Sequence, residues 1–137
     1  MIGESVISFR KELSENLGYF RKQSCQLYSK MRYVSCQFTA YLQNDLWRRN
    51  AAHANAMAQR LKEGIEQIAP VEFTQPVDAN ILLLRLPEKM IPLLQKDYHF
   101  YVWNDANNEI RLVTSFDTTQ NDIDCFLSDF ERIYKAL

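Results

Sequence analysis

The sequence of 137 residues contains little glycine, proline or cysteine: three, four and three residues respectively. It has no internal repeat and no low-complexity linker, so nothing indicates a second complete domain. Cys25, Cys36 and Cys125 are odd in number and widely spaced, which fits neither a disulfide framework nor a Cys-x-x-Cys metal or redox site. We therefore expect a reduced, cytoplasmic protein with no metal site.

The sequence also lacks a strong net charge and a long apolar run. Sixteen basic and seventeen acidic residues leave a net charge of −1, so we expect neither nucleic acid nor an anionic membrane as a partner. The longest apolar run, residues 81–84, is too short to span a bilayer, and no signal peptide opens the chain. Hydrophobic residues make up 47% and charged residues 24%, values typical of a folded globular domain.

The first half of the sequence predicts one strand followed by helices. Residues 4–9 have the pattern of a strand, as expected of a chain that begins within a fold. Residues 10–43 favour helix, either continuous or with a break. Asn44 or Asp45 can cap a second helix that stops before Pro70. Its apolar residues recur at spacings of three and four and predict a buried seam. The seam consists of Trp47, Ala51, Ala54, Ala58, Leu61, Ile65 and Ile68.

The second half predicts a small sheet. Residues 71–75 and 79–86 are strand candidates, the second of them central, and a short helix follows from Pro87 to about residue 97, limited or kinked by Pro92. Residues 99–103 and 109–115 flank a turn-rich five-residue segment and predict a hairpin.

The last predicted helix begins at Thr118 or Thr119, with Asp122 in a capping-box position. Its apolar stripe comprises Ile123, Phe126, Leu127, Phe130, Ile133, Tyr134 and Leu137. This order of elements predicts an α+β fold, a small and mostly antiparallel sheet covered by helices.

Arg111 is the candidate ligand-binding residue. Strand alternation places it on one face with Val113 and Ser115, and its planar fork of donors matches a carboxylate bidentately. The alternative is an ordinary surface ion pair, which is the commoner role of a strand arginine.

The segment from Arg111 to Thr119, followed by Asp122 and Ile123, resembles a segment near the end of threonine aldolases. Further landmarks of that family stand upstream in the same order: Arg21, Lys22, Met31 and Arg32, then residues 44–47, 53–58 and 76–80. Nearly the whole chain is covered, and together these motifs resemble the threonine aldolase and β-eliminating lyase family.

The resemblance implies the C-terminal small domain, residues 1–137, of a pyridoxal-phosphate enzyme of fold type I, with residues 1–43 connecting it to a large cofactor domain. It implies that Arg111 holds the substrate α-carboxylate while threonine is cleaved to glycine and acetaldehyde, or while a related β-elimination occurs. The family's Schiff-base lysine would precede this chain. We therefore expect a fragment that is inactive alone and holds no cofactor covalently.

The basic residues Arg21, Lys22, Lys30 and Arg32 form a weaker candidate site. The resemblance suggests that Arg32 and Lys22 approach the cofactor phosphate, either of their own subunit or of a neighbouring subunit; the alternative is a solvated helix face. Residues 26–30 depart from the glycine-rich stretch of many family members, and Ser115 stands where many have histidine. His53 and His99 are isolated, which favours structural roles.

A second class of function remains open, a non-catalytic interaction or oligomerisation module with the same fold. Removal of a large domain should leave apolar surface exposed around Val6, Phe9, Tyr19 and Phe20, and such surface promotes self-association. We therefore expect a homo-oligomer.

Overall fold

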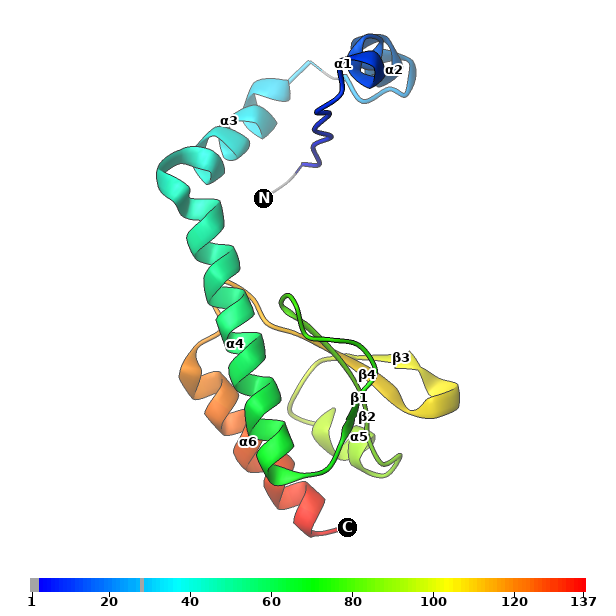
Figure 1. The fold of residues 1–137 in the computed structure, drawn as a ribbon, viewed down its shortest axis with the longest axis vertical. Helices are drawn as coiled ribbons and strands as arrows, with labels where there is room; N and C mark the ends of the chain where they lie inside the picture. Colours follow the sequence, from blue (N-terminus) through cyan, green and yellow to red (C-terminus); the bar gives the residue numbers. More distant parts are fainter. Residues whose placement is uncertain (1–2, 28) are drawn as a thin grey trace. The chain divides into compact units, whose positions relative to one another are not determined.

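The computed structural model describes residues 3–27 and 29–137. The chain divides into two compact units, Met1–Trp47 and Arg48–Leu137, which are described separately. Figure 1 shows the elements of both.

The first unit is helical and has no core among its described residues. Its helices are α1 (Lys11–Ser14), α2 (Leu17–Gln23) and α3 (Met31–Leu42), followed by the 3₁₀ turn η1 (Gln43–Asp45), and none of them contains a buried residue. The prediction of interrupted helix over residues 10–43 is confirmed. The strand predicted at residues 4–9 is wrong, because the described part of this unit holds no second strand to satisfy its backbone groups.

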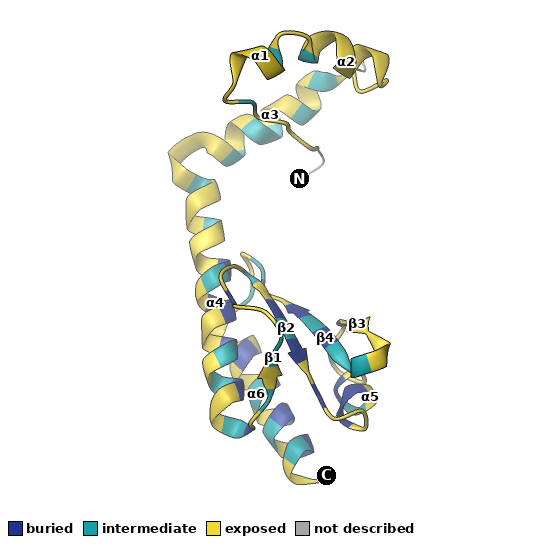
Figure 2. Cartoon of the chain, turned by 45° about the vertical axis from the view of Figure 1, so that its right-hand side comes forward, coloured by how far each residue is buried: buried dark blue, intermediate teal, exposed yellow. Residues whose placement is uncertain are grey.

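Apolar side chains of the first unit lie on its surface, as the sequence predicts. Val6 is 84% exposed, Phe9 95%, Tyr19 77% and Phe20 58%. Figure 2 shows that the buried residues gather instead in the second unit.

The second unit is built on a four-stranded sheet. Its strands are β1 (Glu72–Phe73), β2 (Ile81–Arg85), β3 (Tyr101–Asn104) and β4 (Glu109–Val113). The order is β1-β2-β4-β3 and every pairing is antiparallel. This confirms the predicted antiparallel sheet, its hairpin and the central position of β2.

Three helices cover one face of this sheet: α4 (Leu46–Ile68), α5 (Met90–Leu94) and α6 (Gln120–Lys135). Alternation along β2 and β4 directs Leu82, Leu84 and Ile110 toward them, and all three side chains are 0% exposed. The short α5 accommodates Pro92 because the first turn of a helix needs no N–H hydrogen bond there.

The predicted seam of α4 is correct only from Ala54 onward. Ala54, Ala58, Leu61 and Ile65 are buried, whereas Ala51 is exposed and Trp47 is 43% exposed. The helix extends beyond the sheet at its first residues, so its periodicity there has no core to face.

Helix α6 begins as predicted. Thr119 is its N-cap, its hydroxyl accepts from the Asp122 N–H, and Asp122 accepts in return from the Thr119 N–H. Ile123, Phe126, Phe130 and Ile133 are buried, Leu127 and Tyr134 pack partly buried against the core, and Leu137 is 56% exposed.

Helices α4 and α6 lie side by side and approach closely at Gly64 (Figure 1). A Cβ atom at this position would clash with the Leu127 side chain. Any larger residue at Gly64 would therefore displace Leu127.

The opposite face of the sheet has no helix on it in this unit. Tyr101 is 62%, Trp103 57% and Val113 51% exposed there. Among the described residues, no helix is long and apolar enough to cross a membrane.

Candidate functional site

Arg111 lies in the middle of β4, on the uncovered face of the sheet. Its neighbours in register are Leu83 on β2 and Tyr101 on β3. The residues before and after it, Ile110 and Leu112, point into the core, so alternation fixes the outward direction of the Arg111 side chain. The side chain is half-buried and starts from a central strand, which holds its base rigidly.

The guanidinium of Arg111 contacts an aromatic ring and no carboxylate. Its Cζ atom lies 5.3 Å from the centroid of the Trp103 ring. Within residues 3–27 and 29–137 it makes no ion pair or side-chain hydrogen bond, whereas Arg60 and Arg85 are each 2.7 Å from a carboxylate oxygen. The surface ion pair considered from the sequence is therefore absent, and the donors of Arg111 remain available to a ligand.

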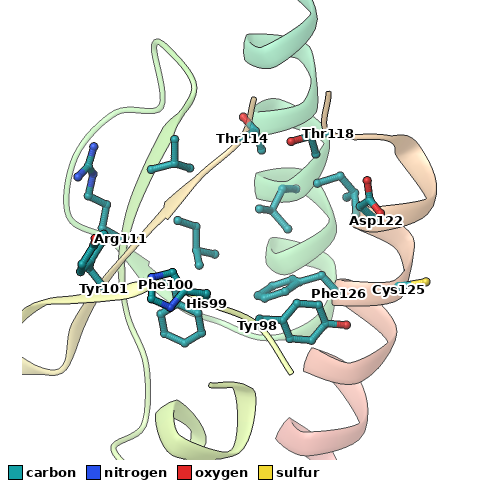
Figure 3. Close-up of a pocket in the computed structure, with 14 residues that line it drawn as sticks. Tyr98, His99, Phe100, Tyr101, Arg111, Thr114, Thr118, Asp122, Cys125 and Phe126 are labelled. Atoms are coloured by element: carbon teal, nitrogen blue, oxygen red, sulfur yellow. The ribbon is translucent and has the colours of Figure 1, made fainter. Parts of the chain in front are cut away.

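A pocket of about 500 Å³ adjoins Arg111 where β4 runs past the start of β3 (Figure 3). Its lining is mostly apolar and aromatic and includes Phe100, Leu112 and Phe126. Figure 3 shows Arg111 and Tyr101 on one side of this pocket, with α6 on the other. The cavity is thus bounded by the strand edge and by the last helix.

The segment after β4 is fixed by hydrogen bonds from several elements. Thr114 is 3% exposed; its hydroxyl donates to the carbonyl of Ala54 at 2.7 Å, and its carbonyl accepts from the Asn80 amide at 2.7 Å. The Ser115 N–H donates to Thr118 Oγ1 at 2.8 Å. These bonds explain the polar residues Thr114 and Thr118, since they anchor the end of β4.

His53 and His99 have structural surroundings. His53 Nε2 lies 2.7 Å from the carbonyl oxygen of Thr118, while the His99 ring packs edge-on against Tyr101 at 5.6 Å between centroids. No group of three His, Cys, Asp or Glu side chains that could hold a metal occurs in the described part of the chain.

A polar cluster joins the loop before β3 to α6. The Tyr98 hydroxyl donates to Asp129 at 2.7 Å, and Arg132 donates to the other oxygen of the same carboxylate at 2.6 Å. Partial burial, then the hydrogen bond to Asp129 and its negative charge, raises the pKa of Tyr98 to about 12. Hydrogen bonds from Arg132 and then from Tyr98 lower the pKa of Asp129.

This cluster predicts a stability loss at high pH. The folded chain keeps the Tyr98 proton more tightly than the unfolded chain, whose tyrosine pKa is about 10. The contribution of Tyr98 to the free energy of unfolding should therefore be complete below pH 10, and it should disappear as the pH rises to about 12. Replacing Tyr98 with phenylalanine should remove this loss, together with the rise in tyrosinate absorbance near pH 12. An unchanged titration in Tyr98→Phe would contradict the assignment.

The basic residues proposed from the sequence lie in the first unit. Arg21 and Lys22 are in the last turn of α2, Lys30 precedes α3 and Arg32 is on it, and all four are exposed. Their position relative to Arg111 is not fixed, because the two units are placed independently.

Arg111 is the arginine in the lining of this pocket. The residues lining the pocket include no lysine, so no amine stands near Arg111 to form a Schiff base. Arg111 therefore offers this pocket a cation for an anionic ligand.

Trp103 was not predicted from the sequence as part of the site, although it contacts Arg111. The predicted hairpin could have indicated this contact. If residues are paired outward from its loop, Tyr101 lies opposite Arg111 and Trp103 lies diagonal to it.

Comparisons with known proteins identify relatives of the chain. No family model matches it. It is 33% identical over 136 residues to the low specificity L-threonine aldolase of Pseudomonas sp. (strain NCIMB 10558), covering 98% of this chain and 39% of that protein. It is 36% identical over 118 residues to the protein of the same name from Pseudomonas aeruginosa, covering 85% of this chain and 34% of that protein.

A solved structure gives the same result. The Leishmania major threonine aldolase superposes with a TM-score of 0.78 and 28% identity, over 86% of this chain and 35% of the other. The chain thus spans between a third and two-fifths of the length of these relatives. In sequence and in fold, the chain is a relative of the threonine aldolases and corresponds to the small C-terminal α+β domain of these fold-type I enzymes.

Proposed function

We propose that the chain is the substrate-orienting domain of a pyridoxal-phosphate-dependent lyase that acts on β-hydroxy amino acids, and that Arg111 binds the substrate α-carboxylate. The observation that carries this proposal is an outward arginine on a rigid strand with no ion-pair partner in the described chain. The names of the Pseudomonas relatives supply the substrate class.

The role of Arg111 follows from the shape of its side chain. A guanidinium donates two parallel hydrogen bonds to a carboxylate and thereby fixes the plane of that group as well as its position. Fixing the carboxylate leaves the substrate Cα–Cβ bond in one orientation for cleavage. Pyridoxal phosphate, when bound in a full-length enzyme, supplies the electron sink that this chain lacks.

A chimera tests this function. The matched 136 residues of the Pseudomonas sp. relative would be replaced by this chain, and the purified chimera assayed with pyridoxal phosphate and L-threonine. We expect release of glycine and acetaldehyde, and no release from the chain alone. Release of a 2-oxo acid and ammonia instead would indicate β-elimination, and a folded, cofactor-loaded chimera without lyase activity would contradict the proposal.

Arg32 and Lys22 are proposed to contact the cofactor phosphate. Both side chains are exposed and cationic, as a phosphate ligand requires. In the chimera, Arg32→Ala should weaken pyridoxal phosphate affinity, as measured by fluorescence titration, and Arg10→Ala is the matched control on an exposed arginine of the same unit.

The second candidate is a non-catalytic oligomerisation module. Val6, Phe9 and Tyr19 favour it, because these apolar side chains are exposed and exposed apolar surface can promote association. Light scattering on the pure chain tests this: a stable homo-oligomer combined with an inactive chimera would favour this module over the lyase domain.

A further inference from the structure

Trp103 is the side chain that contacts the Arg111 guanidinium. It is 57% exposed, so it contributes little to the core of the unit. Its contact within the unit is with Arg111, whose Cζ atom lies 5.3 Å from the centroid of the ring.

The backbone of β3 determines where the ring lies. Tyr101 pairs with Arg111 and Val102 with Ile110, but the register shifts between Val102 and Asn104, so that Trp103 lies at the irregularity. Such irregularities increase the local twist and re-aim a side chain. Diagonal neighbours on adjacent strands are within reach of aromatic and long side chains, as Trp103 and Arg111 are here.

The hairpin loop stabilises this geometry. The Asn104 side chain accepts from the Ala106 N–H at 3.1 Å, and Asn108 ends the loop in the left-handed conformation with φ 55°. Asparagine tolerates that conformation better than most residues. The irregular end of β3 is therefore specified by local sequence.

Contact with an aromatic ring, unlike an ion pair, leaves the N–H donors of an arginine free to bind a ligand. A carboxylate partner would occupy the in-plane N–H donors of Arg111, the same donors that a ligand carboxylate needs. A ring attracts the cation through its π face, which restricts the side chain without providing a competing acceptor. Trp103 can thus order Arg111 before a ligand arrives.

We propose that Trp103 is a positioning residue that holds the Arg111 guanidinium in one orientation for carboxylate binding. The ordering of Arg111 concerns this chain alone; the identity of the carboxylate as that of an amino-acid substrate rests on the proposed function. Trp103 itself contacts no reacting atom.

The ordering is tested by NMR on the full chain, without cofactor or substrate. The heteronuclear NOE of the Arg111 Nε–Hε group should match that of ordered backbone amides in the unaltered chain and in Trp103→Phe, which keeps a ring. In Trp103→Leu it should fall to the value of the exposed Arg32, and Trp47→Leu, which changes the only other tryptophan, should leave it unchanged. An Arg111 signal that stays equally ordered in Trp103→Leu would overturn the proposal.

The consequence for binding is tested in the chimera with L-threonine. We expect Trp103→Leu to raise KM about 2- to 5-fold, with Trp103→Phe close to the unaltered chimera, because an exposed cation–π contact contributes that modest factor. Equal KM values for the Leu and Phe variants would overturn the role in binding. If the unaltered chimera is inactive, the proposed function fails, and the NMR result still decides the ordering of Arg111.

Discussion

Replacing Arg111 with methionine in the chimera should lower kcat/KM for L-threonine by roughly 100- to 10,000-fold. Methionine keeps an unbranched apolar stem but removes two charge-assisted hydrogen bonds, each contributing about 1.5–3 kcal/mol, and each 1.36 kcal/mol corresponds to about tenfold in rate. The kcat/KM of Arg111→Lys should lie between those of the unaltered chimera and of Arg111→Met, with a loss of about 10- to 100-fold. Lysine keeps the positive charge but not the planar fork of donors.

Arg85→Met is the matched control for this change. Arg85 is on the same face of the sheet, at the end of β2, but its guanidinium is paired with Glu72 at 2.7 Å. An exposed ion pair of this kind contributes at most about 1 kcal/mol to stability, so we expect little effect on kcat/KM. Equal losses in the two variants would show a general effect of sheet-face charge and would remove Arg111 from the site.

The largest loss of stability is expected for Phe130→Ala. Phe130 is 0% exposed in the middle of α6, with its ring 6.1 Å from that of Phe126. Truncating a buried phenylalanine costs about 3–5 kcal/mol through lost transfer free energy and the cavity that remains. Small domains have only about 5–15 kcal/mol in total, so this variant should be largely unfolded at moderate urea concentrations.

Phe116→Ala makes the same substitution on the surface of the same unit. Phe116 is 64% exposed, and substitutions at such positions usually change stability by no more than about 0.5 kcal/mol. Urea unfolding followed by far-ultraviolet circular dichroism would compare the two variants. Similar midpoints for both would mean that α6 does not form the core described above.

The elements that were predicted correctly are those whose ends or turns are determined by residues close together in the sequence. The Thr119–Asp122 capping box, the stop before Pro70 and the asparagine-rich hairpin loop are each specified by a few neighbouring residues. The strand predicted at residues 4–9 failed because a strand depends on a partner that local propensity does not report. The prediction that Trp47 is buried failed for a similar reason, because helical periodicity does not reveal where the sheet beneath a helix ends.

The candidate site shows the same division. Strand alternation was sufficient to place Arg111 outward, and the structure confirms that orientation. Its contact with Trp103 was not predicted, because the register shift between Val102 and Asn104 that sets the position of the ring becomes visible only once the strand pairing is known. The grouping of Arg32 and Lys22 with Arg111 depends on the placement of two units and remains a prediction.

The division between Trp47 and Arg48 has a consequence for proteolysis. The helices of the first unit are short, and their described residues bury nothing, so they open readily and expose their backbone to a protease. Trypsin should therefore cut first at the exposed lysine and arginine residues of the first unit, which include Arg21, Lys22 and Arg32. The surviving product should retain the sheet, α5, α6 and the Arg111–Trp103 pair. A shortened chain of this kind would keep the proposed carboxylate site while losing both proposed phosphate contacts.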